Sequence, residues 1–148
     1  MRAVVMAGGL GSRLGALTEN LPKPMLPLAG KPILAIVLEQ LRREGFHDVT
    51  ITTGFRAEMI QDHFGDGARW GLRIRYTHET EPLGTVGALS LVDPLSAGPI
   101  LVMNGDVLTT QSLREVLDFH IAQKAAITVG IVRHAQDVPF GVVTREGD

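Results

Sequence analysis

The hydrophobic pattern changes its period several times along the chain, and the changes predict strands that alternate with helices. Residues 2–7 (RAVVMA) form a short apolar run that ends at glycines, which is typical of a strand buried on both faces of a parallel sheet. Residues 48–54 and 99–106 have the same character. Residues 72–79 alternate as a half-exposed strand does, and residues 126–133 (AITVGIVR) predict one strand more.

Helical spacing appears between these runs. The clearest helix has Pro32 in its first turn and ends at Gly45, which suits a C-cap, and apolar residues recur between them every three or four positions. Residues 56–65, 84–93 and 112–124 predict three further helices.

This order predicts an α/β fold: a Rossmann-like, doubly wound, mostly parallel sheet with helices on both faces, in three layers α/β/α. Such sheets bind their ligands at the carboxyl ends of the strands. A glycine-rich stretch after residue 7 and the sequence NGD at residues 104–106 both fall at strand ends of this kind.

Composition narrows the class of protein. The 148 residues suit one domain, and a net charge of −2 gives no general attraction to nucleic acid or to an anionic membrane, so neither is expected as a partner. The absence of cysteine excludes disulfides and thiolate chemistry, and with no long apolar run it favours a cytoplasmic protein. The chain stops after FGVVTREGD, a strand-and-turn pattern with nothing after it to pack on, so we expect a C-terminal portion to be missing.

The stretch AGGLGSRLGALTENLPKPMLPLAGKP (residues 7–32) indicates phosphate binding. Glycines let backbone N–H groups approach phosphate oxygens closely. The dinucleotide fingerprint would need a glycine where Leu14 stands, and the P-loop pattern fails because Gly30 and Lys31 are followed by Pro32, so both are disfavoured.

Two cations in this stretch complete the anion site. Lys23 lies between two prolines that restrict its backbone, and Arg13 offers a planar fork suited to two phosphate oxygens. The alternative is a flexible surface loop with two solvated charges.

The whole pattern resembles the sugar-1-phosphate nucleotidyltransferases. The glycine-rich stretch, EPLGTVGAL, VMNGDVLT and FGVV occur in the order and with roughly the spacing of that family, over the whole chain. Ala16 stands where the family often has proline, so we expect a softer loop. The resemblance implies transfer of a nucleotidyl group from a nucleoside triphosphate to a sugar 1-phosphate, giving an NDP-sugar and pyrophosphate.

The resemblance also implies roles for particular residues. The phosphates would be bound by Ala7, Gly8, Gly9, Gly11, Ser12, Arg13 and Lys23. Arg13, Lys23 and Asp106 would be catalytic, with Asp106 as the ligand of a Mg²⁺ cofactor. A helix-capping role is the alternative for Asp106. Asn104 and Gly141 are candidates for sugar binding, although Asn104 could equally be structural and FGVV an ordinary strand.

The base site would include Glu79, Gly84 and Thr85. Guanine presents two adjacent N–H donors, and one carboxylate can accept from both. Uracil and thymine present one N–H between two carbonyls, which an amide side chain pairs with better. Glu79 therefore favours GTP, in line with the resemblance of LGTVGAL to the mannose-1-phosphate guanylyltransferase branch. UTP or dTTP remains an alternative, and a solvated loop charge is the other reading of Glu79.

Two family features are absent from the sequence, namely a downstream lysine in Glu-Lys-Pro that binds the sugar phosphate and a later second metal-binding aspartate. Their absence keeps open a non-catalytic or truncated nucleotide-binding module. A dinucleotide oxidoreductase is a more distant alternative. The sugar and the oligomeric state, including a homo-oligomer, stay open.

Overall fold

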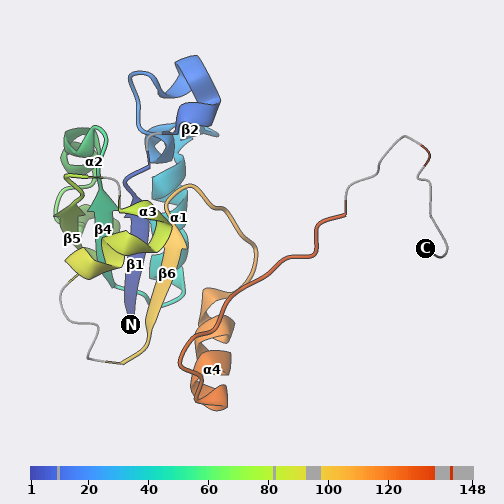
Figure 1. Ribbon diagram of the computed structural model, residues 1–148. Coiled ribbons are helices and arrows are strands. Elements are labelled where there is room, and N and C mark those ends of the chain that lie inside the picture. Colours follow the sequence, from blue (N-terminus) through green and yellow to red (C-terminus); the bar gives the residue numbers. More distant parts are fainter. Residues whose placement is uncertain (10, 82, 93–97, 136–140, 142–148) are drawn as a thin grey trace.

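Four parallel strands form the central sheet of the computed structural model, which describes residues 1–9, 11–81, 83–92, 98–135 and 141 (Figure 1). They are β1 (Arg2–Ala7), β4 (Asp48–Thr53), β5 (Arg73–His78) and β6 (Ile100–Asn104). The spatial order is β5-β4-β1-β6, and each neighbouring pair is parallel. The predicted parallel sheet is confirmed.

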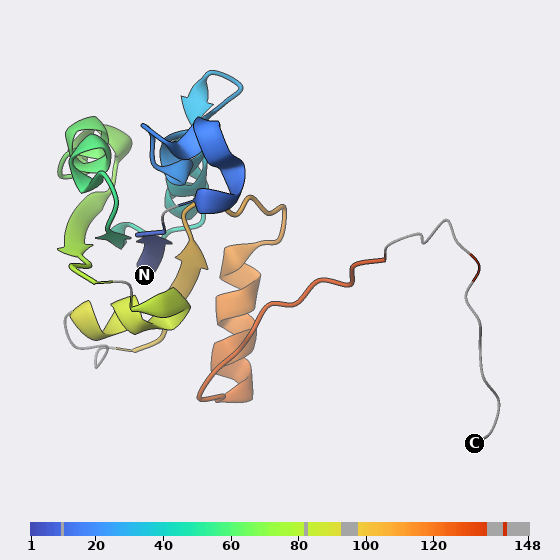
Figure 2. The same ribbon diagram turned by 45° about the horizontal axis from the view of Figure 1, so that its top comes forward.

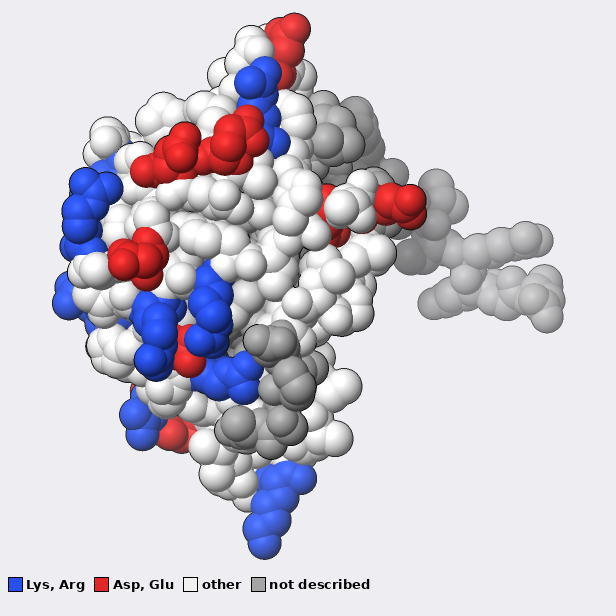
Figure 3. All heavy atoms as spheres, turned by 90° about the vertical axis from the view of Figure 1, so that its left-hand side faces the viewer, with Lys and Arg blue, Asp and Glu red and all other residues white. Residues whose placement is uncertain are grey.

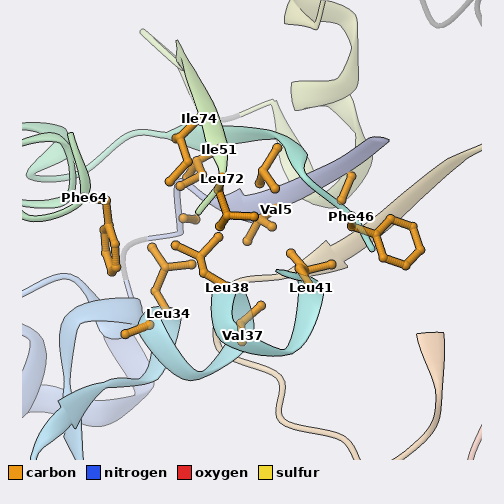
Figure 4. Close-up of a cluster of buried hydrophobic side chains, with 14 of the residues drawn as sticks. Val5, Leu34, Val37, Leu38, Leu41, Phe46, Ile51, Phe64, Leu72 and Ile74 are labelled. Carbon is orange, nitrogen blue, oxygen red and sulfur yellow. The ribbon is translucent and has the colours of Figure 1, made fainter. Parts of the chain in front are cut away.

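One face of the sheet packs on α1 (Ile33–Arg43) and α2 (Ala57–Phe64). Because side chains alternate along a strand, Val5 of β1 and Ile51 of β4 point to this face, where both are fully buried. Figure 4 shows them against Leu34 and Leu38 of α1. The predicted C-cap is present, since Gly45 has φ 88° and its N–H donates to the carbonyl of Arg42 at 3.1 Å.

The other face is covered by α3 (Gly84–Gly87) and the 3₁₀ helix η4 (Ala88–Leu91) (Figure 2). The helix predicted over residues 84–93 is thus present in two short pieces. Val4 of β1 and Ala88 are buried on this side. Helices on both faces confirm the three-layer arrangement.

α4 (Leu113–Gln123) lies beside β6, and Leu113 and Leu117 join the core that α1 builds. Ser112 caps it, because its hydroxyl accepts from the N–H of Glu115 at 3.2 Å. None of the described helices has the length and apolar character needed to cross a membrane.

The chain between β1 and α1 folds into short pieces that the hydrophobic pattern did not predict. They are the 3₁₀ helices η1 (Ser12–Thr18) and η2 (Lys23–Met25) and a two-residue hairpin of β2 (Pro27–Leu28) and β3 (Lys31–Pro32). A further 3₁₀ helix, η3 (Ala68–Trp70), precedes β5. Elements this short carry no periodicity that a pattern can detect.

β5 is the edge strand on the side that Figure 3 shows. Arg73 and Arg75 of β5 pair with Asp48 at 3.7 and 2.7 Å. Positive and negative groups are interspersed over the described part of this face (Figure 3).

The strand predicted over residues 126–133 is wrong. These residues have no regular structure and lead away from the sheet (Figure 1), and Ile127, Val129 and Ile131 are 80%, 72% and 92% exposed. An alternating pattern supplies the side chains of a strand, but a strand also needs a hydrogen-bonded neighbour, and no described strand lies beside this segment. The strand predicted for FGVV lies outside the described residues, apart from Gly141.

Candidate functional site

The sheet has a point where its strand order reverses, between β1 and β6. From β1 the chain runs outward through β4 to β5 and then returns across the sheet to β6 on the other side of β1. Ligands of open α/β sheets bind at such points, outside the carboxyl ends of the strands. The loops that follow β1 and β6 both begin there.

Lys23 and Asp106, both expected at the ligand edge of the sheet, form an ion pair at this point. The Lys23 ammonium lies 2.5 Å from a carboxylate oxygen of Asp106, and the two side chains are 38% and 23% exposed. Lys23 begins η2 between two buried prolines, Pro22 and Pro24, which restrict its backbone. The N–H of Gly105 donates to the carbonyl of β1 residue Met6 at 2.8 Å, which ties the loop of Asp106 to β1. The site therefore holds one cation and one anion on restrained backbone.

Glu79 lies against the first glycine of the loop. A Cβ at Gly8 would collide with a carboxylate oxygen of Glu79, and one at Gly54 would lie 2.7 Å from the carbonyl oxygen of Gly8. Glu79 itself is fixed from two sides, since its N–H donates to the Thr53 carbonyl at 2.8 Å and its carboxylate accepts from the N–H of Leu83 at 3.4 Å. The carboxylate thus lies between the glycine-rich loop and the start of α3.

The other predicted residues are placed as follows. Ala7 is the buried last residue of β1, Gly9 is exposed, and Gly11 has a left-handed φ of 64°. Asn104 is the half-buried last residue of β6, paired in register with Met6. Gly84, with φ 75°, begins α3.

For the remaining predicted residues the described part of the structure gives no contact within the site. Ser12 and Arg13 belong to η1 and Thr85 to α3, but their side chains lie outside what the structure describes. Gly141 is exposed, and a Cβ there would meet no described atom within 4 Å.

The donor set at Asp106 fits a divalent cation that brings its other ligands with it. The described residues contain no group of three His, Cys, Asp or Glu side chains that could hold a metal ion. Mg²⁺ is commonly held by one or two carboxylates together with substrate phosphates and water. A single, partly exposed carboxylate meets that requirement.

Two residues of this site were missed by sequence reasoning. Gly54 follows β4 as Gly8 follows β1, and the register pairs the preceding residues, Ala7 and Thr53. A glycine after each of two adjacent strands was a signal that could have found it. Thr18 is 4% exposed and donates its hydroxyl into the glycine-rich loop, a contact with no pattern in the sequence.

The chain is similar to known proteins in sequence. The sequence pattern of the nucleotidyl transferase family matches residues 2–148. A mannose-1-phosphate guanylyltransferase of Mycobacterium tuberculosis is 41% identical over 142 residues, which are 95% of this chain and 40% of that protein. A D-glycero-alpha-D-manno-heptose 1-phosphate guanylyltransferase of Aneurinibacillus thermoaerophilus is 36% identical over 148 residues, 99% of this chain and 64% of that protein.

A solved structure is similar as well. The crystal structure of a putative glucose-1-phosphate thymidylyltransferase from Bacillus anthracis superimposes with a TM-score of 0.77 at 25% identity, over 84% of this chain and 51% of that one. The chain spans less than two thirds of the length of each of these relatives. With the family pattern matched over nearly its whole length and the sheet shared with a solved relative, the chain belongs to the nucleotidyl transferase family.

Proposed function

We propose that this chain forms the nucleotide-binding part of a sugar-1-phosphate nucleotidyltransferase, with GTP as the triphosphate. The observation that carries the proposal is the pairing of Lys23 with Asp106 where the strand order reverses, beside the glycine-rich loop. A cation for phosphate and a carboxylate for a divalent ion are the two groups that a metal-bound triphosphate requires.

The triphosphate lies along the loop after β1. N–H groups of Gly8, Gly9 and Gly11, preceded by Ala7 and followed by Ser12, approach the phosphate oxygens, and Arg13 and Lys23 neutralise the β- and γ-phosphates. The positive φ of Gly11 supports this arrangement, because it turns the backbone as other residues rarely can.

The transfer is an in-line displacement. An oxygen of the sugar 1-phosphate forms a bond to the α-phosphorus, the bond from that phosphorus to the bridging oxygen of the β-phosphate breaks, and pyrophosphate leaves with the electron pair. The attacking phosphate is already an anion, so no general base is needed. Arg13 and Lys23 act by position and charge, stabilising the negative charge that gathers on the leaving group.

Asp106 would hold Mg²⁺, which when bound supplies positive charge to the α-phosphate. Asn104, which ends β6 two residues earlier, is a candidate contact for the sugar or the nucleotide. Gly141 stays a candidate for sugar binding by resemblance alone.

Glu79 carries the preference for guanine. Its carboxylate accepts the two adjacent N–H donors of that base, while Gly84 and Thr85 at the start of α3 bring backbone close to it. Both relatives compared by sequence are described as guanylyltransferases, which supports GTP, whereas the solved relative is described as a thymidylyltransferase. Glu79→Gln is expected to reduce the ratio of GTP to dTTP affinity.

Pyrophosphate release tests the activity. The chain is incubated with Mg²⁺, with GTP, UTP or dTTP, and with mannose 1-phosphate or other hexose and heptose 1-phosphates. Lys23→Ala and Arg13→Ala are each expected to lower the rate at least ~10²-fold, as loss of a preorganised charge contact does. Lys31→Ala is the matched control, because Lys31 pairs with Glu39 at 2.7 Å on the exposed surface of α1. An unchanged rate in Lys23→Ala would refute the assigned role.

A nucleotide-binding module without turnover is the second candidate, favoured by the absence from this sequence of the Glu-Lys-Pro lysine and the second metal-binding aspartate. Calorimetric binding of GTP with Mg²⁺ and no pyrophosphate release from any sugar phosphate would select it.

A further inference from the structure

Thr18 closes the glycine-rich loop on itself. It is the last residue of η1, and its hydroxyl lies 3.0 Å from the carbonyl oxygen of Gly11 and 3.3 Å from that of Gly15, so that both share one donated hydrogen. Only 4% of Thr18 is exposed, although it lies in a loop whose neighbouring residues are exposed. A buried hydroxyl is normally kept only where its hydrogen bond is made.

The contact holds a turn of the loop at which the backbone is left-handed. Gly11 has φ 64°, and its carbonyl also accepts from the N–H of Leu14 at 3.0 Å. A Cβ at Gly11 would lie 3.0 Å from the methyl group of Thr18 and 3.3 Å from Cβ of Lys23. The Gly11 turn therefore lies against both Thr18 and the start of the Lys23 side chain.

We propose that Thr18 is a positioning residue for the triphosphate, a role that rests on the function proposed above. Its hydroxyl fixes the Gly11 turn, which lies against Cβ of Lys23, so the N–H groups and the ammonium are oriented before the nucleotide arrives. Without the hydroxyl the loop must be ordered during binding, and the entropy lost at that moment weakens affinity. The loss falls on the β- and γ-phosphates, because the proposed function assigns these to Lys23, against which the Gly11 turn lies.

The test compares two nucleotides and two substitutions in the 148-residue chain. Thr18→Val keeps the shape and removes the hydroxyl, whereas Thr18→Ser keeps the hydroxyl and removes the methyl group. Affinities for GTP and for GMP, each with Mg²⁺, are measured by displacement of a fluorescent guanine nucleotide. Thr18→Val is expected to weaken the affinity for GTP about tenfold, the ratio that loss of one hydrogen bond gives. Its affinity for GMP is expected to change by less than about twofold. Thr18→Ser is expected to stay within about threefold of the unsubstituted chain for both.

A role in stability alone would give a different result. It would lower the melting temperature and weaken the affinities for GTP and GMP by equal factors. Either that outcome or an unchanged affinity for GTP would overturn the proposal. Thr52→Val is the matched control, since Thr52 is buried but its hydroxyl has no partner among the described residues. If Thr18→Val does not fold, Thr18→Cys, whose thiol is a weak donor, must show the same difference between the nucleotides.

The unsubstituted chain separates this proposal from the one on which it rests. If it binds neither GTP nor GMP, the proposed function fails and the role of Thr18 fails with it. If it binds GTP and Thr18→Val binds equally well, only the role of Thr18 is refuted.

Discussion

The close approach of Gly54 and Gly8 leaves no room for a Cβ atom at position 54. A Cβ at position 54 would lie 2.7 Å from the carbonyl oxygen of Gly8 and 3.2 Å from its Cα, both parts of the backbone, which cannot rotate away. We expect Gly54→Ala to lower the free energy of unfolding by roughly 1–3 kcal/mol, as overpacking does. Urea unfolding of both chains measures this difference in the free energy of unfolding. Gly65→Ala, at a glycine with open space, controls for added volume but introduces strain of its own at φ 56°. A Gly54→Ala chain as stable as the original would show that the two backbones are not in contact.

Two adjacent threonines of β4 give a matched pair. The Thr53 hydroxyl donates to the Thr77 carbonyl at 2.9 Å, whereas the buried hydroxyl of Thr52 has no partner among the described residues. Thr53→Val should therefore cost about 1 kcal/mol of stability, while Thr52→Val should be neutral or stabilising, because it removes an unsatisfied polar group. Denaturant midpoints of the two variants give the comparison. A larger loss in Thr52→Val would contradict the hydrogen bonding described here.

At this scale the sequence predicts the charged residues better than the neutral ones. Asp106 ends one predicted strand and Lys23 lies in the stretch that follows another, so both were expected at the carboxyl edge of the sheet, where the structure pairs them. Thr18 and Gly54 act through contacts with particular backbone atoms. Such contacts depend on the path of a loop, which no periodicity encodes.

α4 is joined to α1 through Glu44. The Glu44 carboxylate accepts from the N–H of Arg114 at 2.9 Å, from the Ser112 hydroxyl at 3.1 Å and from the Gln40 amide at 3.0 Å. Partial burial raises the pKa of Glu44, but these hydrogen bonds to the charged form outweigh it, so the pKa is lowered from its ordinary value of 4.5. An anion at the start of α4 also suits the helix dipole.

The lowered pKa fixes the direction of a pH effect. The contribution of Glu44 to stability is complete above pH 4.5, where the unfolded chain is also ionised, and is lost as the pH falls through the lower folded value. Glu44→Gln should therefore melt a few degrees below the original chain at pH 7, with a smaller difference at pH 3. Calorimetry at both values measures this. Glu58→Gln, at an exposed glutamate of α2, is the control. A difference that stays constant with pH would rule out the ionised carboxylate as the cause.

Elements of eight or more residues were predicted nearly to their ends, because their apolar residues repeat often enough to define a face. α1 and α4 are examples. The predicted helix over residues 84–93 instead changes from α to 3₁₀ after Gly87. The hairpin of β2 and β3 depends on a turn at Ala29 and Gly30, both with positive φ, rather than on a hydrophobic pattern.

At the scale of the whole molecule, residues 126–133 form an exposed apolar segment whose side chains alternate as those of a strand do. Ile127, Val129 and Ile131 are 72–92% exposed, and β6 is an edge strand of the sheet. Exposed apolar strands and open edges favour association between chains. We expect the chain to associate as its concentration rises and the variant Ile127→Lys/Ile131→Lys to do so less, at an unchanged melting temperature. Light scattering after gel filtration measures the mass. Equal association of both would exclude the segment as the contact.

The parallel fold was predictable because the longer strands and helices each have a recognisable hydrophobic period. Right-handed crossovers then limit how they can be arranged. The failure at residues 126–133 has the opposite cause, because pairing is a property of two segments and the pattern describes only one.

The ion pair of Lys23 and Asp106 has a consequence for selectivity. The two charges neutralise each other. An anion that bound Lys23 alone would leave the Asp106 carboxylate without its partner, and a cation that bound Asp106 alone would leave the Lys23 ammonium without its partner. Under the proposed function, a polyphosphate that carries its own divalent ion would replace both partners in one exchange. The ion pair would thus favour such a complex over simple salts.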